Sequence, residues 1–296
     1  MPGHQLCKLV VLGALVAPGA AQAVPRTIPA EVWTDIDRTL LGTSCVLRAT
    51  VRANDPLDLV RAAERGGSYL RLKLEVHESL TVVDPDEPLP DRMTFFAAPE
   101  SHPHGFHPTA NDMRNHLGQE RLFLLQRIGD RNFLTDRFRG TSIFPTDRAA
   151  ALKLLVDEHQ HSRTTPLPDN LPHAARLAEL IDQLAQRRGR AALDAWNELQ
   201  RLPLGVVPAL VGYLDDDRGL GNQEFLLRRG GPQDLTISAH HPKKVGQAAL
   251  LLLRHISGEA IGPREPEKAN PEQLAQAASC WRVLAHRLLR LQVNDR

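Results

Sequence analysis

The spacing of apolar residues changes near residue 147, and this change limits the possible folds more than any other feature of the chain. From about residue 40 to residue 144, apolar and polar residues alternate, which is typical of strands with one buried face. From residue 146 onward, apolar residues recur every three or four positions, as on one side of an α-helix. The sequence therefore predicts an α+β protein, with a β-domain over residues 24–145 and an α-helical domain over residues 146–296.

The β-domain is expected to be a small antiparallel barrel. Its clearest strand covers residues 69–78, where Leu70, Leu72 and Leu74 alternate with charged residues. Further strands are predicted at residues 45–51, 93–97, 121–127 and 132–138. Gly129 and Asp130 separate the last two strands and indicate a tight hairpin. About five short strands with few helices between them favour a barrel or a sandwich, and we expect the barrel.

The second domain is expected to be entirely α-helical. Helices are predicted at residues 147–159, 172–187, 191–202, 206–214, 241–258 and 271–293. Pro172 suits a first helical turn, because the amide hydrogen that proline lacks has no helical partner there. Gly258 suits a helix C-terminus. Residues 219–239 show no regular period, so we predict an irregular insertion.

Motifs between residues 172 and 290 relate the second half to a known type of domain. They are Trp196-Asn197-Glu198-Leu199, the run from Leu202 to Leu210, Leu214-Asp215-Asp216-Asp217-Arg218, Ile256-Ser257-Gly258-Glu259 and Trp281-Arg282. With these motifs the second half resembles the HEAT-like helical domains of uncharacterised exported bacterial proteins, which implies a broad helical binding surface. A closed helical bundle is the alternative, because only one helix pair is clear and a solenoid usually needs about three.

The first half carries a second resemblance. The order of its strands and the run Gly118-Gln119-Glu120-Arg121-Leu122-Phe123-Leu124-Leu125 are similar to the OB-fold of netrin-like and metalloprotease-inhibitor-like modules. The chain lacks the cysteine framework of those modules, so the resemblance implies an OB-like barrel without protease inhibition. Neither resemblance names a catalytic residue, and a fold alone does not supply a function.

The first 23 residues have the features of a secretory signal peptide. Lys8 precedes an apolar run from Leu9 to Val16, and the triplet Ala21-Gln22-Ala23 offers a cleavage site. The run is too short for a membrane span, which needs about 20 apolar residues. We therefore expect an exported protein, periplasmic or extracellular, with no membrane insertion after the leader is removed.

Composition limits the possible partners. Lys8 is the only charged residue of the leader, so cleavage would leave 35 basic and 35 acidic residues. Proteins bind nucleic acids and anionic membranes mainly through an excess of Lys and Arg, and here that excess is missing. We therefore expect no nucleic-acid partner. Two cysteines would remain, Cys45 and Cys280, and the sequence leaves open whether they pair or persist as thiols.

A histidine-rich segment is the sharpest local candidate for a site. His102, His104 and His107 lie within six residues, inside a loop predicted over residues 101–118. Imidazole nitrogen suits zinc and copper, and long loops in compact domains are often functional. We expect either an exposed polar loop or a metal site built from these three histidines, with His116 as the only nearby addition.

The remaining polar motifs are expected to be structural. His159 with His161 and His240 with His241 have no spacing typical of a ligand pair. The acidic run at residues 215–217 lacks the later ligands of a calcium loop. The chain has no Gly-x-Ser-x-Gly elbow, no zinc-protease helix motif and no complete phosphate loop.

These observations favour a non-catalytic exported protein that binds a partner, most plausibly another protein, and no cofactor is expected. One alternative is a metal-binding protein or metal-dependent hydrolase that uses His102, His104 and His107. Another is a barrel that holds a small ligand in its mouth, as loops of such barrels often do.

Overall fold

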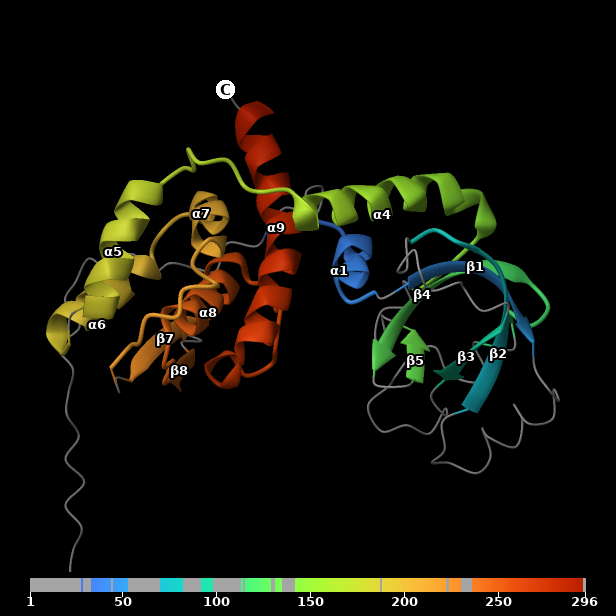
Figure 1. The fold of residues 1–296 in the computed structure, drawn as a ribbon, viewed down its shortest axis with the longest axis horizontal. Helices are drawn as coiled ribbons and strands as arrows, with labels where there is room; N and C mark the ends of the chain where they lie inside the picture. Colours follow the sequence, from blue (N-terminus) through green and yellow to red (C-terminus); the bar gives the residue numbers. More distant parts are fainter. Residues whose placement is uncertain are drawn as a thin grey trace, which may run out of the picture.

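The computed structural model describes residues 28, 33–43, 45–52, 70–81, 92–97, 113, 115–128, 131–134, 142–186, 188–221, 224–229 and 236–294. This part of the chain contains seven α-helices, a six-stranded sheet and a two-stranded hairpin. The large sheet lies on one side of the molecule and most of the helices on the other (Figure 1). The prediction of an α+β protein is confirmed.

The large sheet is mainly antiparallel. Its strands are β1 (Cys45–Arg52), β2 (Leu70–Ser79), β3 (Arg92–Ala97), β4 (Glu120–Ile128), β5 (Arg131–Leu134) and β6 (Ile143–Phe144). The hydrogen-bonded order is β1-β2-β3-β5-β4-β6, and β1 also pairs with β4. The β3–β5 pair is parallel, and the other pairs are antiparallel. Strand β1 therefore has a hydrogen-bonded neighbour on each side.

Strand β2 follows the alternation of the sequence, whereas β1 and β4 do not. In β2, Leu74 is buried while Lys73 and His77 are exposed. The hairpin expected at residues 129–130 agrees with the β4–β5 pair, whose last register position sets Ile128 opposite Arg131. Strand β1 is buried along most of its length, and the consecutive residues Leu122 to Leu125 of β4 are all buried. A strand with both faces covered does not need to alternate.

Helices α1 (Asp35–Leu41) and α4 (Ala149–Thr164) pack against the sheet. Leu40 of α1, Val46 of β1, Leu122 of β4 and Leu152 of α4 belong to one buried cluster. The short 3₁₀ turn η1 (Thr146–Arg148) leads from β6 into α4. Helix α4 ends before Thr165, which adopts an extended conformation (ψ 127°) as expected for a residue that precedes proline.

The second half packs its helices around one large core. Its elements are α5 (Ala174–Gln186), α6 (Arg190–Leu199), η2 (Leu204–Val206), α7 (Val207–Val211), α8 (Val245–Ser257), η3 (Pro266–Lys268) and α9 (Pro271–Asn294). Trp196 and Trp281 are buried in this core, and so are Ile28 and Trp33, which precede the sheet in the sequence. The N-terminal segment thus packs on the helical half before the chain enters the sheet.

The prediction that the second half is all-α is wrong at one place. Strands β7 (Phe225–Arg229) and β8 (Thr236–His240) form an antiparallel hairpin inside the segment predicted to be irregular. The side chains of Phe225 and Leu227 enter the helical core. Trp196 Nε1 and Gln200 Nε2, on and just after α6, both donate to the carbonyl oxygen of Leu226, at 2.9 Å and 3.0 Å. A two-stranded hairpin is marginal alone, so these contacts account for its stability.

Candidate functional site

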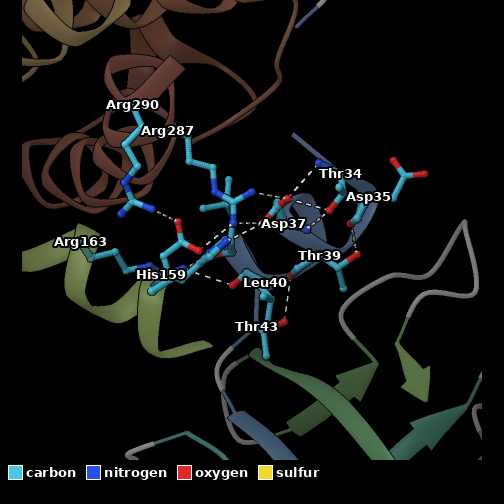
Figure 2. A network of polar contacts seen from close by, with 12 residues as sticks. Thr34, Asp35, Asp37, Thr39, Leu40, Thr43, His159, Arg163, Arg287 and Arg290 are labelled. Atoms are coloured by element: carbon cyan, nitrogen blue, oxygen red, sulfur yellow. Dashed lines mark hydrogen bonds and ion pairs between the residues drawn. The ribbon is translucent and has the colours of Figure 1, made fainter. Parts of the chain in front are cut away.

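Helix α1 lies between the sheet and the helical half (Figure 1). One of its faces is buried, and the other borders a cleft. A capping box starts the helix, in which the hydroxyl oxygen of Thr34 accepts from the Asp37 amide and the Asp37 carboxylate accepts from the Thr34 amide. This reciprocal pairing satisfies backbone donors that have no helical partner. It also fixes the carboxylate of Asp37 on the face that looks toward α4 and α9 (Figure 2).

The first face of α1 holds a buried ionic network around Asp37. The Asp37 side chain is fully buried and contacts His159 Nε2 at 2.9 Å and Arg287 Nη1 at 2.9 Å (Figure 2). Burial alone would raise the pKa of Asp37, but hydrogen bonds from His159 and Thr34 and the charge of Arg287 outweigh it, so the pKa lies below its ordinary value. The carboxylate is therefore held in its charged form.

The network extends over three helices. Arg287 of α9 also contacts Glu158 of α4 at 3.4 Å, and Glu158 accepts from Arg290 at 2.7 Å. Arg163 of α4 donates to the carbonyl oxygens of Leu40 and Leu41 at the C-terminal end of α1. A cation satisfies unpaired carbonyl groups well at that end of a helix. The contacts tie α1, α4 and α9 together.

This network offers a structural role rather than a reaction centre. A carboxylate only accepts, so the proton of His159 lies on Nε2, and the ring stacks on Trp33 with 6.1 Å between the centroids. The hydroxyl of Thr34 donates to Asp37 at 2.7 Å and is occupied there. Both Asp37 and His159 are buried, which leaves no opening for a substrate.

The other face of α1 borders an open cleft of about 610 Å³ between the sheet and the helical half. It is lined by Asp35, Arg38, Thr39, Leu41, Gly42, Gln126, Glu259, Ala260, Ile261, Gly262, Pro263, Gln273, Gln276, Ala277 and Cys280. These residues come from α1, the sheet strand β4, the loop after α8 and the first turns of α9. The cleft therefore exists only where the two halves meet.

A bidentate ion pair closes one side of the cleft. Arg38 of α1 donates from Nη2 and Nε to the carboxylate of Glu259, at 2.7 Å and 3.0 Å. Its third nitrogen, Nη1, donates to Asp35 at 3.0 Å. Hydrogen bonding to Glu259 outweighs burial and raises the pKa of Arg38. The two carboxylates neutralise the guanidinium, so a bound anion would find no unpaired charge on this arginine.

The loop after α8 forms a rigid wall of the cleft. Arg254 donates to the carbonyl oxygens of Ile261, Gly262 and Pro263, at 2.6–3.0 Å. Gly262 has a positive φ of 92°, and a Cβ atom there would lie 3.0 Å from the Cβ of Ala277. Glycine is therefore required where this loop passes close to α9. The hydrogen bonds and the close approach hold the wall in one conformation.

Both cysteines of the expected mature chain lie in the described part of the structure. Cys45 is buried in β1, and Cys280 is half-buried in the cleft wall with its Sγ 3.9 Å from the carbonyl oxygen of Leu41. Both are thiols, so the open question of a bridge is answered in favour of two separate sulfhydryl groups. Only Cys280 borders the cleft.

Of the histidines singled out in the sequence, those that the structure describes do not line the cleft. His102, His104 and His107, proposed as metal ligands, fall outside the described residues, as does the predicted leader over residues 1–23. Where the structure is described, no group of three or more His, Cys, Asp or Glu side chains is arranged to hold a metal ion. His116, the nearby histidine, is half-buried.

Asp216, in the acidic run weighed as a calcium site, has another role. Its carboxylate accepts from Arg218 Nε at 3.0 Å and Nη2 at 2.7 Å. Burial would raise the pKa of Asp216, but these hydrogen bonds lower it overall. The residue forms a local ion pair that shapes the turn before β7.

The sequence interpretation missed both the network and the cleft. The Thr34 to Asp37 spacing is a capping-box signal and could have located α1. No local pattern could have linked Asp37 to His159 and Arg287, which are more than 120 residues away. His159 was expected to be structural, and the structure shows that its partner is the distant carboxylate of Asp37.

Comparisons with known proteins found no relatives: no protein-family model matches the chain, and neither does any curated protein or solved structure. Among the described helices, none combines the length and apolar content that crossing a bilayer requires. The geometry of the molecule is therefore the basis on which a function can be assigned.

Proposed function

We propose that this chain is an exported binding protein that takes a short segment of a partner protein into the cleft between its sheet and its helical half. The observation that carries the proposal is the cleft itself. Its volume of about 610 Å³ falls within the range of about 300–1,000 Å³ that is usual for ligand sites. Sites of this kind occur preferentially where two structural units meet.

The chemistry of the lining supports binding rather than catalysis. The lining combines polar side chains such as Gln126 and Gln276 with apolar ones such as Leu41 and Ile261. Amide side chains both donate and accept hydrogen bonds, which suits the amide groups of a peptide backbone. No histidine is among the described lining residues, so the thiol of Cys280 has no imidazole base beside it.

The cleft is also preformed, because contacts on both of its sides fix the elements that line it. The Asp37 network fixes α1 against α4 and α9, and Arg254 fixes the loop opposite α1. A preformed site loses less conformational entropy when a ligand binds. The balanced charge of the expected mature chain further favours a protein partner over nucleic acid.

For the first half, we also propose an OB-like barrel. The pairing of β1 with both β2 and β4, together with the parallel β3–β5 pair, supports this assignment. For the second half we propose a HEAT-like arrangement, supported by the packing of α5 against α6 and of α7 against α8. Export rests on the leader-like residues 1–23, and N-terminal sequencing of protein recovered from the periplasm or medium would test it.

Cys280 provides a direct test of the binding proposal. A random peptide library would be screened against the mature protein, and the bound peptides would be tested for protection of Cys280 from a maleimide. Peptides in the cleft should slow the alkylation of Cys280. Gln276→Trp, an exposed α9 position that lines the cleft, should weaken their affinity about 10-fold or more.

Ala275→Trp is the matched control, because Ala275 is exposed on the same helix and does not line the cleft. This variant should bind peptides as the unmodified protein does. The proposal would be wrong if no library peptide protected Cys280, or if both tryptophan variants reduced affinity equally.

A further inference from the structure

The β7–β8 hairpin carries two polar side chains on the face that looks toward the core. Ser238 and His240 are two residues apart on β8, so their side chains point to the same side of the strand. Their register partners are Leu227 and Phe225, which are buried in the helical core. Ala239, between them, and Ile237, just before Ser238, are exposed, and Ile237 is 52% exposed. Ser238 and His240 therefore lie at the edge of the core, partly shielded from water.

The imidazole of His240 joins the serine to a carboxylate. Its Nε2 lies 2.9 Å from Ser238 Oγ, and its Nδ1 lies 2.7 Å from Glu267 Oε1 in η3. A carboxylate only accepts hydrogen bonds, so the proton of the neutral ring sits on Nδ1 and points to Glu267. Nε2 is then left as an acceptor, and the hydroxyl of Ser238 donates to it.

Serine hydrolases activate the hydroxyl of their nucleophile with the same arrangement of serine, histidine and carboxylate. A base contacts the nucleophile through one ring nitrogen, and a third group fixes the tautomer through the other. The His240 and Glu267 side chains are 20% and 26% exposed, so they are partly desolvated but remain open to a ligand. Partial desolvation strengthens the hydrogen bonds between them.

We propose that Ser238, His240 and Glu267 form a hydrolytic site that cleaves acyl esters. This activity goes beyond the binding function of the cleft, since none of the three residues lines the cleft. It gives His240 a role beyond the structural one expected from the sequence. Ser238 and His240 act as catalytic residues, and Glu267 is a positioning residue that orients the imidazole.

The reaction requires only water besides the ester. Ser238 Oγ attacks the acyl carbon while its proton passes to His240 Nε2. His240 then gives this proton to the departing alcohol as the ester C–O bond breaks, which leaves the acyl group on Ser238. Water, deprotonated by His240, adds to the acyl carbon, and the carboxylic acid leaves as Ser238 recovers its proton. Glu267 stabilises the imidazolium in each step.

The test uses the mature protein with two probes. A biotin-tagged fluorophosphonate, which reacts with activated serines, should label Ser238, as located by mass spectrometry. Hydrolysis of 4-nitrophenyl acetate should give a turnover above the uncatalysed rate. Ser238→Ala should abolish labelling, and His240→Gln should slow both reactions by about 100-fold or more.

Matched controls separate catalysis from folding. His241→Gln and Ser279→Ala change a neighbouring histidine and a serine that bonds only locally, to the Gln276 carbonyl oxygen, and both should keep full labelling. All variants are checked by thermal melting. Added imidazole should restore part of the activity of His240→Ala, which a purely structural histidine would not allow. Glu267→Gln should lower the rate and alter its pH profile.

Two outcomes would overturn the proposal. One is a folded wild-type protein that neither reacts with the fluorophosphonate nor hydrolyses the acetate. The other is a reaction that persists unchanged in folded Ser238→Ala or His240→Gln, which would place the chemistry elsewhere in the chain.

Discussion

The two faces of α1 differ in their exposure to water, although both carry aspartate and arginine contacts. On one face Asp37 is fully buried among His159, Arg287 and Thr34. On the other face the Asp35 side chain is 49% exposed beside Arg38, at the border of the cleft. The same residue types thus form a buried ionic network around Asp37 on one face and line an open cleft on the other.

The buried face of α1 is therefore expected to contribute to stability, and the cleft face to ligand binding. A buried charge that loses its partner is costly, because the remaining charge stays out of water. An exposed ion pair contributes little, because water and salt screen it. We therefore expect substitutions on the Asp37 face to change the free energy of unfolding, and substitutions on the cleft face to change mainly ligand affinity.

The largest effect is expected from Asp37→Ala. It should lower the free energy of unfolding by about 3–5 kcal/mol, because His159 and Arg287 would lose their buried carboxylate. Asp35→Ala is the matched control, two residues away on the same helix, and should cost less than about 1 kcal/mol. Urea denaturation of both variants measures the two values. Similar losses of unfolding free energy in the two variants would show that the two faces of α1 do not differ in their contribution to stability.

Acid should lower the stability that the buried network around Asp37 provides. The pKa of Asp37 in the folded protein lies below its ordinary value of 3.8. The carboxylate therefore contributes its full stabilisation above that value and loses it as the pH falls through the lower, folded pKa. Unfolding free energies measured from pH 5 downward should fall more steeply for the wild type than for Asp37→Asn. Parallel curves would show that Asp37 does not titrate differently in the folded state.

A smaller effect is expected at the ion pair across the cleft. Glu259→Gln should cost about 1 kcal/mol, because the Arg38 side chain is 32% exposed while that of Glu259 is 12% exposed. Raising the salt concentration should reduce the difference in unfolding free energy between this variant and the wild type. Urea denaturation at two salt concentrations checks both points, and a loss that salt does not change would contradict this account.

The smallest effect is expected at the outer end of the network. Arg290 reaches Glu158, but its side chain is 58% exposed, so Arg290→Gln should cost no more than about 0.5 kcal/mol. Arg287→Gln, one helical turn earlier and with a 14% exposed side chain, should cost several-fold more. Comparing the two in one denaturation series tests whether burial, rather than charge, sets the size of the effect.

Much of the secondary structure could be predicted because it depends on local patterns. The alternation around Leu74 predicted β2, and the three-to-four spacing before Gly258 predicted α8 and its left-handed end at φ 74°. The hairpin β7–β8 escaped prediction, because its strands are short and depend on contacts with Trp196 and Gln200. The alternation of Ser238 and His240 was a signal, but five residues are too few to separate a strand from a loop.

The site candidates show where local patterns stop being informative. Hydrophobic period, turn residues and composition were enough to predict an α+β chain, because each depends on residues close together in the sequence. The contacts of Asp37 with His159 and Arg287, and of Arg38 with Glu259, join segments more than 120 residues apart. Only the packing of α1 between the two halves decided which carboxylate is buried and which borders the cleft, because burial is a property of the folded whole.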